Sequence, residues 1–382
     1  MKAGVGFSDH QDPFIAGSSA ARKAIETSGT PNLLVVFTTD FYDPEKVLSG
    51  IKSIHSTTKI VGFCCGGIIT KQGVHTQGIG ICSLSGNFYA GTSLHKGLSQ
   101  SPWKVGIQAG KEILDQGLEK GTILVLPDGF QANMSEMLRG LYSQAGPDFK
   151  YIGGGAGDNL KFFKTYQFTE KDISNDALAL AIIDGLEIST GIGHGWKPIG
   201  YPLTINKVVG KTVFEIDNIP AFHAYSQRLG NISKEDFKYQ GMIHPLGFPD
   251  IAGQYIIRDP ISANGDDSIT FVTEIPSQAV GNIMDCRIHD LIETARIAAY
   301  NAISCIKKPA FTLLFDCISR ILLMEKQFQE EISAIQRLSG DNVPLLGALT
   351  FGEIGSYSDV PLLHNKTTVV AVGDSLEGKK NA

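Results

Sequence analysis

Four residues with chemically useful side chains stand next to apolar segments near the end of the chain. Cys317 and Arg320 come just after the apolar run Leu313–Phe315, Glu353 follows a second run, and Asn365 precedes a third. If these runs are neighbouring strands, the side chains meet at one sheet edge, where open α/β sheets bind ligands. Arg320 would hold an anionic group, Glu353 a cationic group, and Asn365 would fix the orientation. An amino acid or a similar zwitterion fits such a site.

The same residues allow two other interpretations. Arg320 and Glu353 can form a buried ion pair that holds a helix against a glycine loop, because an unpaired buried charge is costly. Cys317 can be a nucleophile, since a helix N-terminus and a nearby guanidinium favour the thiolate. No motif places a base beside it, and the two candidates, His289 and His364, are distant in sequence. A cysteine at a strand end is more often a small buried side chain, so we assign no catalytic residue.

Two further groups of residues suggest binding sites less strongly. The glycine-rich loop Gly153–Asn159 follows a strand, as phosphate-binding loops do. A phosphate-binding loop of the dinucleotide-binding type leads into a helix, whereas the segment after this loop is predicted to be extended. A tight connection between strands, where only glycine fits, is therefore favoured. His95 and His194 stand at strand ends without the further ligands that a metal site needs. Trp196 is a candidate for lining a ligand pocket or a partner surface, and we expect no metal and no cofactor.

The composition argues against several classes of protein. The 382 residues carry 33 Lys and Arg against 39 Asp and Glu, a net charge of −6, which does not suit a nucleic-acid-binding surface. No stretch approaches the ~18 unbroken apolar residues of a membrane span. No apolar region follows Lys2 as in a secretory signal. The six cysteines form no C-x-x-C pair, which indicates reduced thiols. We expect a cytoplasmic protein that contacts neither nucleic acid nor membrane.

The elements that must position these residues form an internal repeat. Three apolar runs read as buried strands, a segment with helical periodicity follows each, and each helix leads to a second strand that contains glycine. The first strands are Leu34–Phe37, Ile123–Leu126 and Leu313–Phe315, and the glycine strands are Ile60–Phe63, Tyr151–Gly154 and Leu345–Ala348. In the first copy Asp43 can cap the helix and Pro44 can take its first position.

Pairs of strands joined by tight turns complete the predicted units. Ser85-Gly86 and Asp184-Gly185 suit two-residue hairpins, and a third hairpin is expected between Tyr255 and Thr273. We therefore predict an α/β fold of repeated α-β-α-β-β units with hairpins, in which helices cover mixed sheets. The predicted domains are residues 1–212 with two copies, residues 213–375 with one larger copy, and a frayed tail at 376–382.

The most specific motifs lie in the C-terminal third. They are Phe315-Asp316-Cys317 with Arg320 and Glu330, then Phe351-Gly352-Glu353-Ile354-Gly355, then His364-Asn365-Lys366-Thr367. These motifs resemble the C-terminal FIST domain, named for F-box and intracellular signal transduction. The N-terminal strands and Gly66-Gly67 resemble the N-terminal FIST domain, with Cys64-Cys65 in place of part of the family's small-residue turn. The resemblance implies a sensory module for small ligands such as amino acids, or an interaction module, and it brings no settled catalytic residues.

Three functions follow from these observations. The first is a small-molecule sensor whose ligand lies near Cys317, Arg320, Glu353 and Asn365. It would signal through a separate protein, because no residues remain for an output domain. The second is a ligand-free interaction scaffold, which would expose a large apolar patch. The third, a cysteine-dependent enzyme, fits the motifs least well. The family resemblance favours the sensor, so the expected partners are a small-molecule ligand and a signalling protein.

Overall fold

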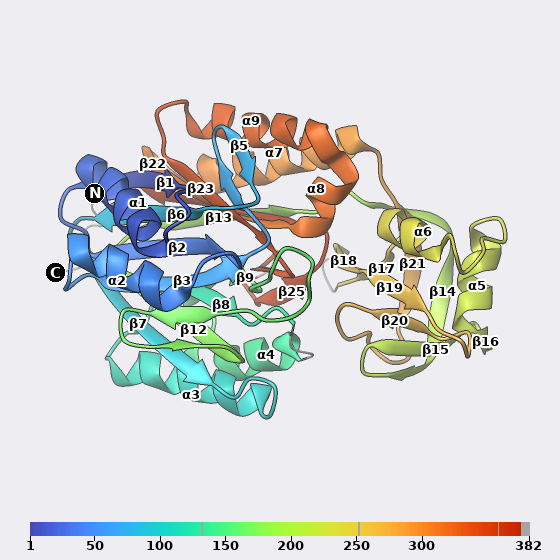
Figure 1. The fold of residues 1–382 in the computed structure, drawn as a ribbon. Coiled ribbons are helices and arrows are strands. Elements are labelled where there is room, and N and C mark those ends of the chain that lie inside the picture. The colour runs from blue at the N-terminus through green and yellow to red at the C-terminus, as the bar shows by residue number, and fades with distance from the viewer. Residues whose placement is uncertain (131–132, 251–252, 358, 376–382) are drawn as a thin grey trace.

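The computed structural model describes residues 1–130, 133–250, 253–357 and 359–375 (Figure 1). Within these ranges the predicted α/β class is confirmed. Three mixed sheets of six strands each carry helices on their outer faces, and a further eight-stranded, barrel-like sheet forms a separate unit. In Figure 1 this unit lies to the right of the body that the other three sheets build.

Three copies of one unit account for the body. The first copy consists of β1 (Lys2–Ser8), α1 (Pro13–Ser28), β2 (Leu33–Thr39), α2 (Pro44–Ile54), β3 (Lys59–Cys65), β4 (Ile68–Thr70), β5 (Gly73–His75) and β6 (Ile79–Ser85). The second consists of β7 (Tyr89–Lys96), α3 (Pro102–Asp115), β8 (Gly121–Pro127), α4 (Met134–Ala145), β9 (Phe149–Gly154), β10 (Gln167–Thr169), β11 (Ile173–Ser174) and β12 (Ala177–Asp184).

The third copy starts with a strand that a long insertion separates from the rest. It consists of β13 (Ile188–Gly193), α7 (Ile288–Ser304), β22 (Pro309–Cys317), α8 (Ile318–Met324), the 3-10 turn η1 (Glu325–Gln327), α9 (Phe328–Ser339), β23 (Leu345–Thr350), β24 (Glu353–Gly355), β25 (Leu362–His364) and β26 (Thr368–Asp374).

The main strands are buried on both faces, which explains their unbroken apolar runs. In β2, Val35 and Phe37 belong to a central core shared by all three sheets, whereas Leu34 and Val36 pack in the cluster beneath α1 and α2. The ring of Phe37 meets that of Phe315 in β22 edge-on, with 5.7 Å between centroids. The sheets of different copies are therefore in direct contact through their inner faces.

The start of α2 confirms the predicted cap. The Asp43 carboxylate accepts hydrogen bonds from the backbone N–H groups of Glu45 and Lys46, and Pro44 opens the helix. Such a cap contributes about 1 kcal/mol to helix stability.

All three copies share one strand order. The first strand of each copy pairs antiparallel with its last strand, the last with the second, and the second runs parallel to the third. The third strand also pairs with the short hairpin of another copy, so that β10 joins β3, β24 joins β9 and β4 joins β23. Each copy thus completes the sheet of another, and this cyclic exchange locks the three copies together.

The hairpins predicted at Ser85-Gly86 and Asp184-Gly185 are wrong. The strand β6 pairs with β1 and β2, whereas β7 pairs with β12; β12 and β13 likewise belong to different sheets. Turn residues determine only a sharp reversal of the chain, and here both turns pass the chain to another sheet. Within the body, the short pairs β4–β5, β10–β11 and β24–β25 form hairpins.

The remaining elements form a unit inserted between β13 and α7. They are β14 (Lys197–Val209), β15 (Thr212–Ile216), β16 (Ile219–Pro220), α5 (Ala221–Arg228), α6 (Phe237–Ile243), β17 (Leu246–Pro249), β18 (Tyr255–Arg258), β19 (Pro260–Ala263), β20 (Ile269–Phe271) and β21 (Val280–Asp285). A hairpin does form between residues 255 and 273 and turns at the expected Asn264-Gly265, but its first strand is β19 rather than the predicted 255–258 segment, because β19 pairs with β20 whereas β18 pairs with β17. This inserted unit has its own apolar core.

Candidate functional site

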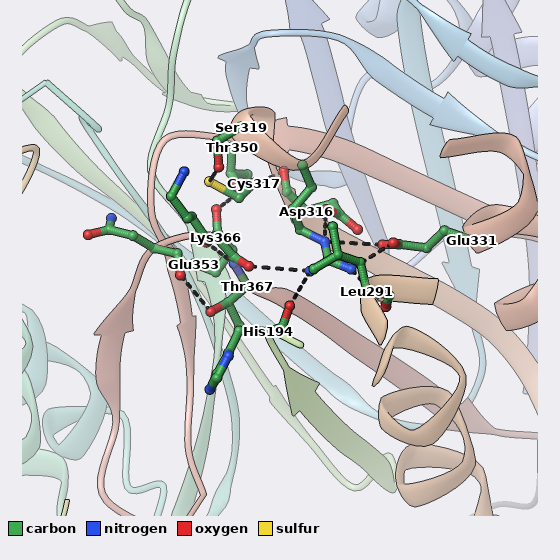
Figure 2. A network of polar contacts seen from close by, with 12 residues as sticks. His194, Leu291, Asp316, Cys317, Ser319, Glu331, Thr350, Glu353, Lys366 and Thr367 are labelled. Carbon is green, nitrogen blue, oxygen red and sulfur yellow. Dashed lines mark hydrogen bonds and ion pairs between the residues drawn. The ribbon is translucent and has the colours of Figure 1, made fainter. Parts of the chain in front are cut away.

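The predicted site residues lie at the carboxyl ends of β22 and β23. Cys317 ends β22 and stands in register with Thr350, the last residue of β23. Its backbone N–H donates to the carbonyl of Thr367 at 3.1 Å. Glu353 opens β24 three residues after Thr350, so the chain brings this carboxyl group to the same strand ends (Figure 2). Parallel strands end at one edge of a sheet, which is why residues distant in sequence meet here.

Arg320 is fully buried, and its guanidinium contacts carboxyl groups and backbone carbonyls from several elements. Nη2 donates to Glu331 Oε2 at 2.6 Å, and Nε donates to Glu331 Oε1 at 3.3 Å. Nη1 donates to the carbonyl of His194 at 2.7 Å, and Nη2 also donates to that of Leu291 at 3.2 Å. Figure 2 labels three of these partners, His194, Leu291 and Glu331. The partner of Arg320 is therefore Glu331 rather than Glu353.

Two buried carboxyl groups lie beside this guanidinium. Asp316 Oδ1 lies 3.2 Å from Nε of Arg320, the same atom that donates to Glu331 Oε1. Burial, and then the charge of Glu331, raise the pKa of Asp316 well above its usual range. The guanidinium compensates charge on the two buried carboxyl groups, which lowers the cost of holding these groups in the interior.

Glu353 is also fully buried, and it is held in its neutral form. Its carboxyl group accepts hydrogen bonds from Thr350 Oγ1 at 2.8 Å and from the N–H of Thr367 at 3.3 Å. Burial raises the pKa of Glu353 to about 8, because desolvation outweighs these hydrogen bonds. At neutral pH the group is therefore largely a carboxylic acid.

Asn365 and its neighbour Lys366 connect the strand ends to the inserted unit. Asn365 accepts a hydrogen bond from Thr273 Oγ1 at 2.8 Å. The ammonium of Lys366 lies 3.0 Å from Asp259 Oδ2 and 5.5 Å from the centre of the Trp196 ring. Both side chains are almost completely buried. Two polar links, one of them ionic, therefore tie the inserted unit to the site.

Cys317 is 5% exposed, and its Sγ lies 3.1 Å from Ser319 Oγ. Burial and then the nearby Glu353 raise the pKa of this thiol. Arg320 was expected to stabilise the thiolate of Cys317, but its guanidinium is already paired with the carboxyl groups of Asp316 and Glu331. Of the two candidate bases, His289 is exposed, and burial lowers the pKa of His364 to about 3. This environment suits an inert structural thiol.

We expect Cys317 to resist alkylation by iodoacetamide at pH 8 in the folded protein, because its thiol is buried and protonated. Cys305 is exposed and serves as the internal control. Peptide mass mapping after a short exposure should show modified Cys305 and unmodified Cys317. Equal labelling of the two would revive the enzyme hypothesis.

An open cavity of about 700 Å³ adjoins the buried network. It is walled by β13, the turn that follows it, the face of α7 with Asp290 and Glu293, and residues 356–357 after β24. His194 lines this cavity with the same backbone segment that receives the Arg320 hydrogen bond. Leu291, another carbonyl partner of Arg320, directly follows the lining residue Asp290. The network thus holds two walls of the cavity in place.

The cavity lining combines aromatic rings with charges of both signs. Trp196 and Tyr357 contribute rings, and Asp290 and Glu293 contribute carboxylates from successive turns of α7. The ammonium of Lys197 lies 2.9 Å from Asp290 Oδ1. The sequence had marked Trp196 as a pocket candidate, and it does line the cavity. Sequence analysis did not identify Asp290 and Glu293, because their only signal is their spacing on the polar face of a long amphipathic helix.

Within the described ranges no three His, Cys, Asp or Glu side chains are grouped so that they could hold a metal ion. None of the helices described combines the length and the apolar character that a membrane crossing requires.

Comparison with known proteins gives two kinds of relatives. An uncharacterized protein of Mycobacterium tuberculosis is 22% identical over 392 aligned positions, which cover 97% of this chain and 99% of the relative. An uncharacterized protein of Methanocaldococcus jannaschii is 31% identical over 119 positions, which cover 28% of this chain and only 23% of the archaeal protein. Among solved structures, PurLQS from Thermotoga maritima aligns over 99% of this chain and 73% of its own, at 10% identity and a TM-score of 0.25. That score is too low to support any argument.

Two family models match the chain almost from end to end. The FIST N domain matches residues 32–219, and the FIST C domain matches residues 221–356. The second match includes Cys317, Arg320 and Glu353, which carried the resemblance in the sequence. This chain belongs to the FIST family, which is linked to signal transduction, and it carries both the N-terminal and the C-terminal domain of that family.

Proposed function

We propose that this chain is a sensory module of signal transduction that binds a small molecule in the cavity beside β13. One observation carries the proposal: the open cavity and the buried Arg320 network share the backbone of His194 and the start of α7. A ligand that displaces either wall would therefore also displace a hydrogen-bond partner of the buried Arg320. The ligand would thereby favour one arrangement of the site over another.

The lining favours an amino acid or a similar zwitterion as the ligand. Asp290 and Glu293 offer carboxylates to a cationic group, and Lys197 offers an ammonium to an anionic group. Charge-assisted hydrogen bonds of this kind are roughly twice as strong as neutral ones. The proposal keeps this ligand class, which the sequence suggested, and moves its direct contacts to the cavity.

The four residues predicted from the sequence would not touch the ligand but would respond to movement of the cavity wall. Arg320 holds His194, and Cys317 and Glu353 fill the adjacent strand ends. Asn365, with its neighbour Lys366, would transmit a displacement to the inserted unit through Thr273. In this proposal a separate signalling protein, in the cytoplasm, recognises the position of the inserted unit.

We expect an amino acid or short metabolite to raise the melting temperature of the protein, and Glu293→Gln to weaken this effect. Ligand at a hundredfold excess over Kd adds about 2.7 kcal/mol to the free energy of unfolding, which corresponds to several degrees. Arg296→Ala is the matched control, because it removes the same exposed ion pair without changing the lining of the cavity. A thermal-shift screen of the three proteins makes the measurement.

The sensor proposal fails if no compound in a broad metabolite panel shifts the wild-type melting temperature. The assignment of the ligand to this cavity is wrong if every ligand that binds shifts the melting temperatures of Glu293→Gln and Arg296→Ala by the same amount.

A ligand-free interaction scaffold is a second candidate, and an exposed aromatic group favours it. Phe162 and Phe163, in the loop between β9 and β10, are 64% and 87% exposed, and Phe41 is 53% exposed. Exposed aromatic side chains are enriched at protein interfaces. The scaffold would be favoured over the sensor if Phe163→Ser abolishes binding of a signalling partner and no compound in the metabolite screen binds.

A further inference from the structure

Each copy receives a short hairpin from another copy, so the body contains three equivalent junctions between a third strand and an incoming hairpin. The strand registers identify the matching residues at these junctions. In β3 and β9, Gly62 and Gly153 pair with Val36 and Val125 of the preceding parallel strand. The residue after each glycine pairs with the first residue of the incoming hairpin strand, Gln167 in one case and Glu353 in the other. Three residues further along these hairpins stand Glu170 in the second copy and Ser356 in the third.

Glu170 fills its place in the second copy with a well-bound carboxylate. Oε2 accepts a hydrogen bond from Thr92 Oγ1 at 2.7 Å and one from the N–H of Ile60 at 3.2 Å. Oε1 accepts a hydrogen bond from the ammonium of Lys59 at 3.1 Å. The side chain is only 14% exposed. Burial opposes its ionisation, yet these hydrogen bonds lower the pKa of Glu170. The first and second copies therefore together form a complete seat for a carboxylate, and Glu170 of the second copy occupies it.

The equivalent place where the second and third copies meet has the equivalent donors but not the equivalent glutamate. Thr190 of β13 corresponds to Thr92 of β7, since they pair with Ala371 and Ala181 at matching positions of β26 and β12. Lys150 corresponds to Lys59, because each stands three residues before the strand glycine. The shorter Ser356 takes the position of Glu170, and both Thr190 and Ser356 line the 700 Å³ cavity.

Lys150, which β9 of the second copy contributes to this place, has other partners. Its ammonium donates to Glu187 Oε1 at 2.6 Å and to the carbonyl of Ile188 at 2.8 Å. Ile188 lies on β13 two residues before Thr190, so the ammonium already stands along this edge. The Glu187 side chain is 56% exposed, and exposed ion pairs exchange partners at little cost. Lys150 can thus turn to an anion that enters the cavity.

The first copy shows that the seat is not a general consequence of the fold. Val5 takes the position of the threonine, and Lys71, three residues after Ile68, takes the position of the glutamate. A valine cannot donate a hydrogen bond, and a lysine cannot accept one from the chain. The set of a threonine and a lysine around an acceptor position is shared by the second and third copies.

We propose that the third copy seats a carboxylate of the ligand against Thr190 and Lys150, in the position that the Glu170 carboxylate occupies in the second copy. This inference rests on the proposed function, and it adds the place and the chemistry of one ligand group. The cationic group of a zwitterion then points toward Asp290 and Glu293, on the wall that α7 provides.

Propionate and propionamide, compared at constant ionic strength, are the probes for this seat. We expect propionate to raise the melting temperature of the wild type in a saturable way, and propionamide to have no effect. Thr190→Val should weaken the response to propionate at least tenfold. Thr92→Val, the matched change in the second copy, should leave that response intact. Equal responses to the acid and the amide would overturn the inference.

Exchange of the two equivalent residues gives a test that does not need the natural ligand. Ser356→Glu should supply the carboxylate from the chain itself, raise the melting temperature without ligand and abolish the response to propionate. Glu170→Ser should lower the melting temperature, and propionate should restore part of the loss by filling the emptied seat. The inference is wrong if Ser356→Glu keeps the full response to propionate, or if Glu170→Ser is not restored.

These results separate the seat from the proposed function. If a metabolite binds in the cavity but neutral analogues bind as well as carboxylates, the sensor proposal is supported and the carboxylate seat is wrong. If the residue exchange succeeds but no metabolite shifts the wild type, the seat exists and the sensor proposal falls.

Discussion

Arg320→Ala is expected to lower the free energy of unfolding by about 3–5 kcal/mol, because it leaves a carboxylate buried without its partner. The guanidinium is fully buried and contacts Glu331, Asp316 and backbone carbonyls from two other elements. Since whole domains are stable by only about 5–15 kcal/mol, the loss should be obvious in urea denaturation. It is the largest single effect that we expect at this site.

Arg296→Ala is the control for this experiment. Arg296 also forms an ion pair with a glutamate, but both side chains are more than 40% exposed. Exposed pairs contribute about 0–1 kcal/mol, so this variant should unfold almost as the wild type does. Similar losses for Arg320→Ala and Arg296→Ala would show that the buried network is not held as described.

Glu353→Gln is expected to become more stable relative to the wild type as the pH rises from 5 to 8. The folded protein retains the proton of Glu353 up to about pH 8, whereas the unfolded chain releases it near pH 4.5. Between these values the unfolded state binds fewer protons, so the wild type loses up to about 1.4 kcal/mol per pH unit through this group. Glutamine carries no such proton, and its amide matches the neutral acid in shape and in hydrogen bonding.

The measurement is the difference in unfolding free energy between the two proteins across this pH range. Burial lowers the pKa values of His194 and His364 to about 4 and about 3, so both histidines destabilise the fold below pH 6.5. They do so in both proteins and cancel in the difference. Glu293→Gln is the control, since the ion pair with Arg296 lowers the pKa of Glu293 and any effect appears only at acid pH. A flat difference between pH 5 and 8 would mean that Glu353 is ionised in the folded state.

The repeated unit could be predicted because its signals are local. Each main strand is apolar on both faces, as Leu34 to Phe37 show, and each glycine strand follows an amphipathic helix. The partners of the strands could not be predicted. A turn such as Ser85-Gly86 has the same residues whether the next strand pairs beside the previous one or enters another sheet. That choice depends on the cyclic exchange of hairpins, which is a tertiary property.

The partner of Arg320 was hidden by a break in the helix that follows it. The apolar periodicity continues from α8 into α9, yet α8 ends at Met324, and Glu325 adopts a positive φ of 49°. The chain changes direction there, and α9 returns Glu331 to the guanidinium. Glu353 looked like the natural partner because it lies at a neighbouring strand end, but burial leaves it protonated.

The cavity was beyond sequence analysis for a similar reason. Its two main walls, β13 and α7, are separated in the chain by the whole inserted unit. Thr190 and Glu293 therefore showed no common pattern, and only His194 and Trp196 pointed to the place. The correspondence of Glu170 with Ser356 needed the strand registers, since the loop before β10 is much longer than the one before β24.

A crystal structure of the full chain soaked with a mixture of amino acids tests the central claim most directly. We predict electron density for a bound molecule in the cavity beside β13, with an acidic group at Thr190 and a basic group toward Glu293, and an undisturbed Arg320 network behind it. Density at another place, with this cavity holding only solvent, would contradict the account.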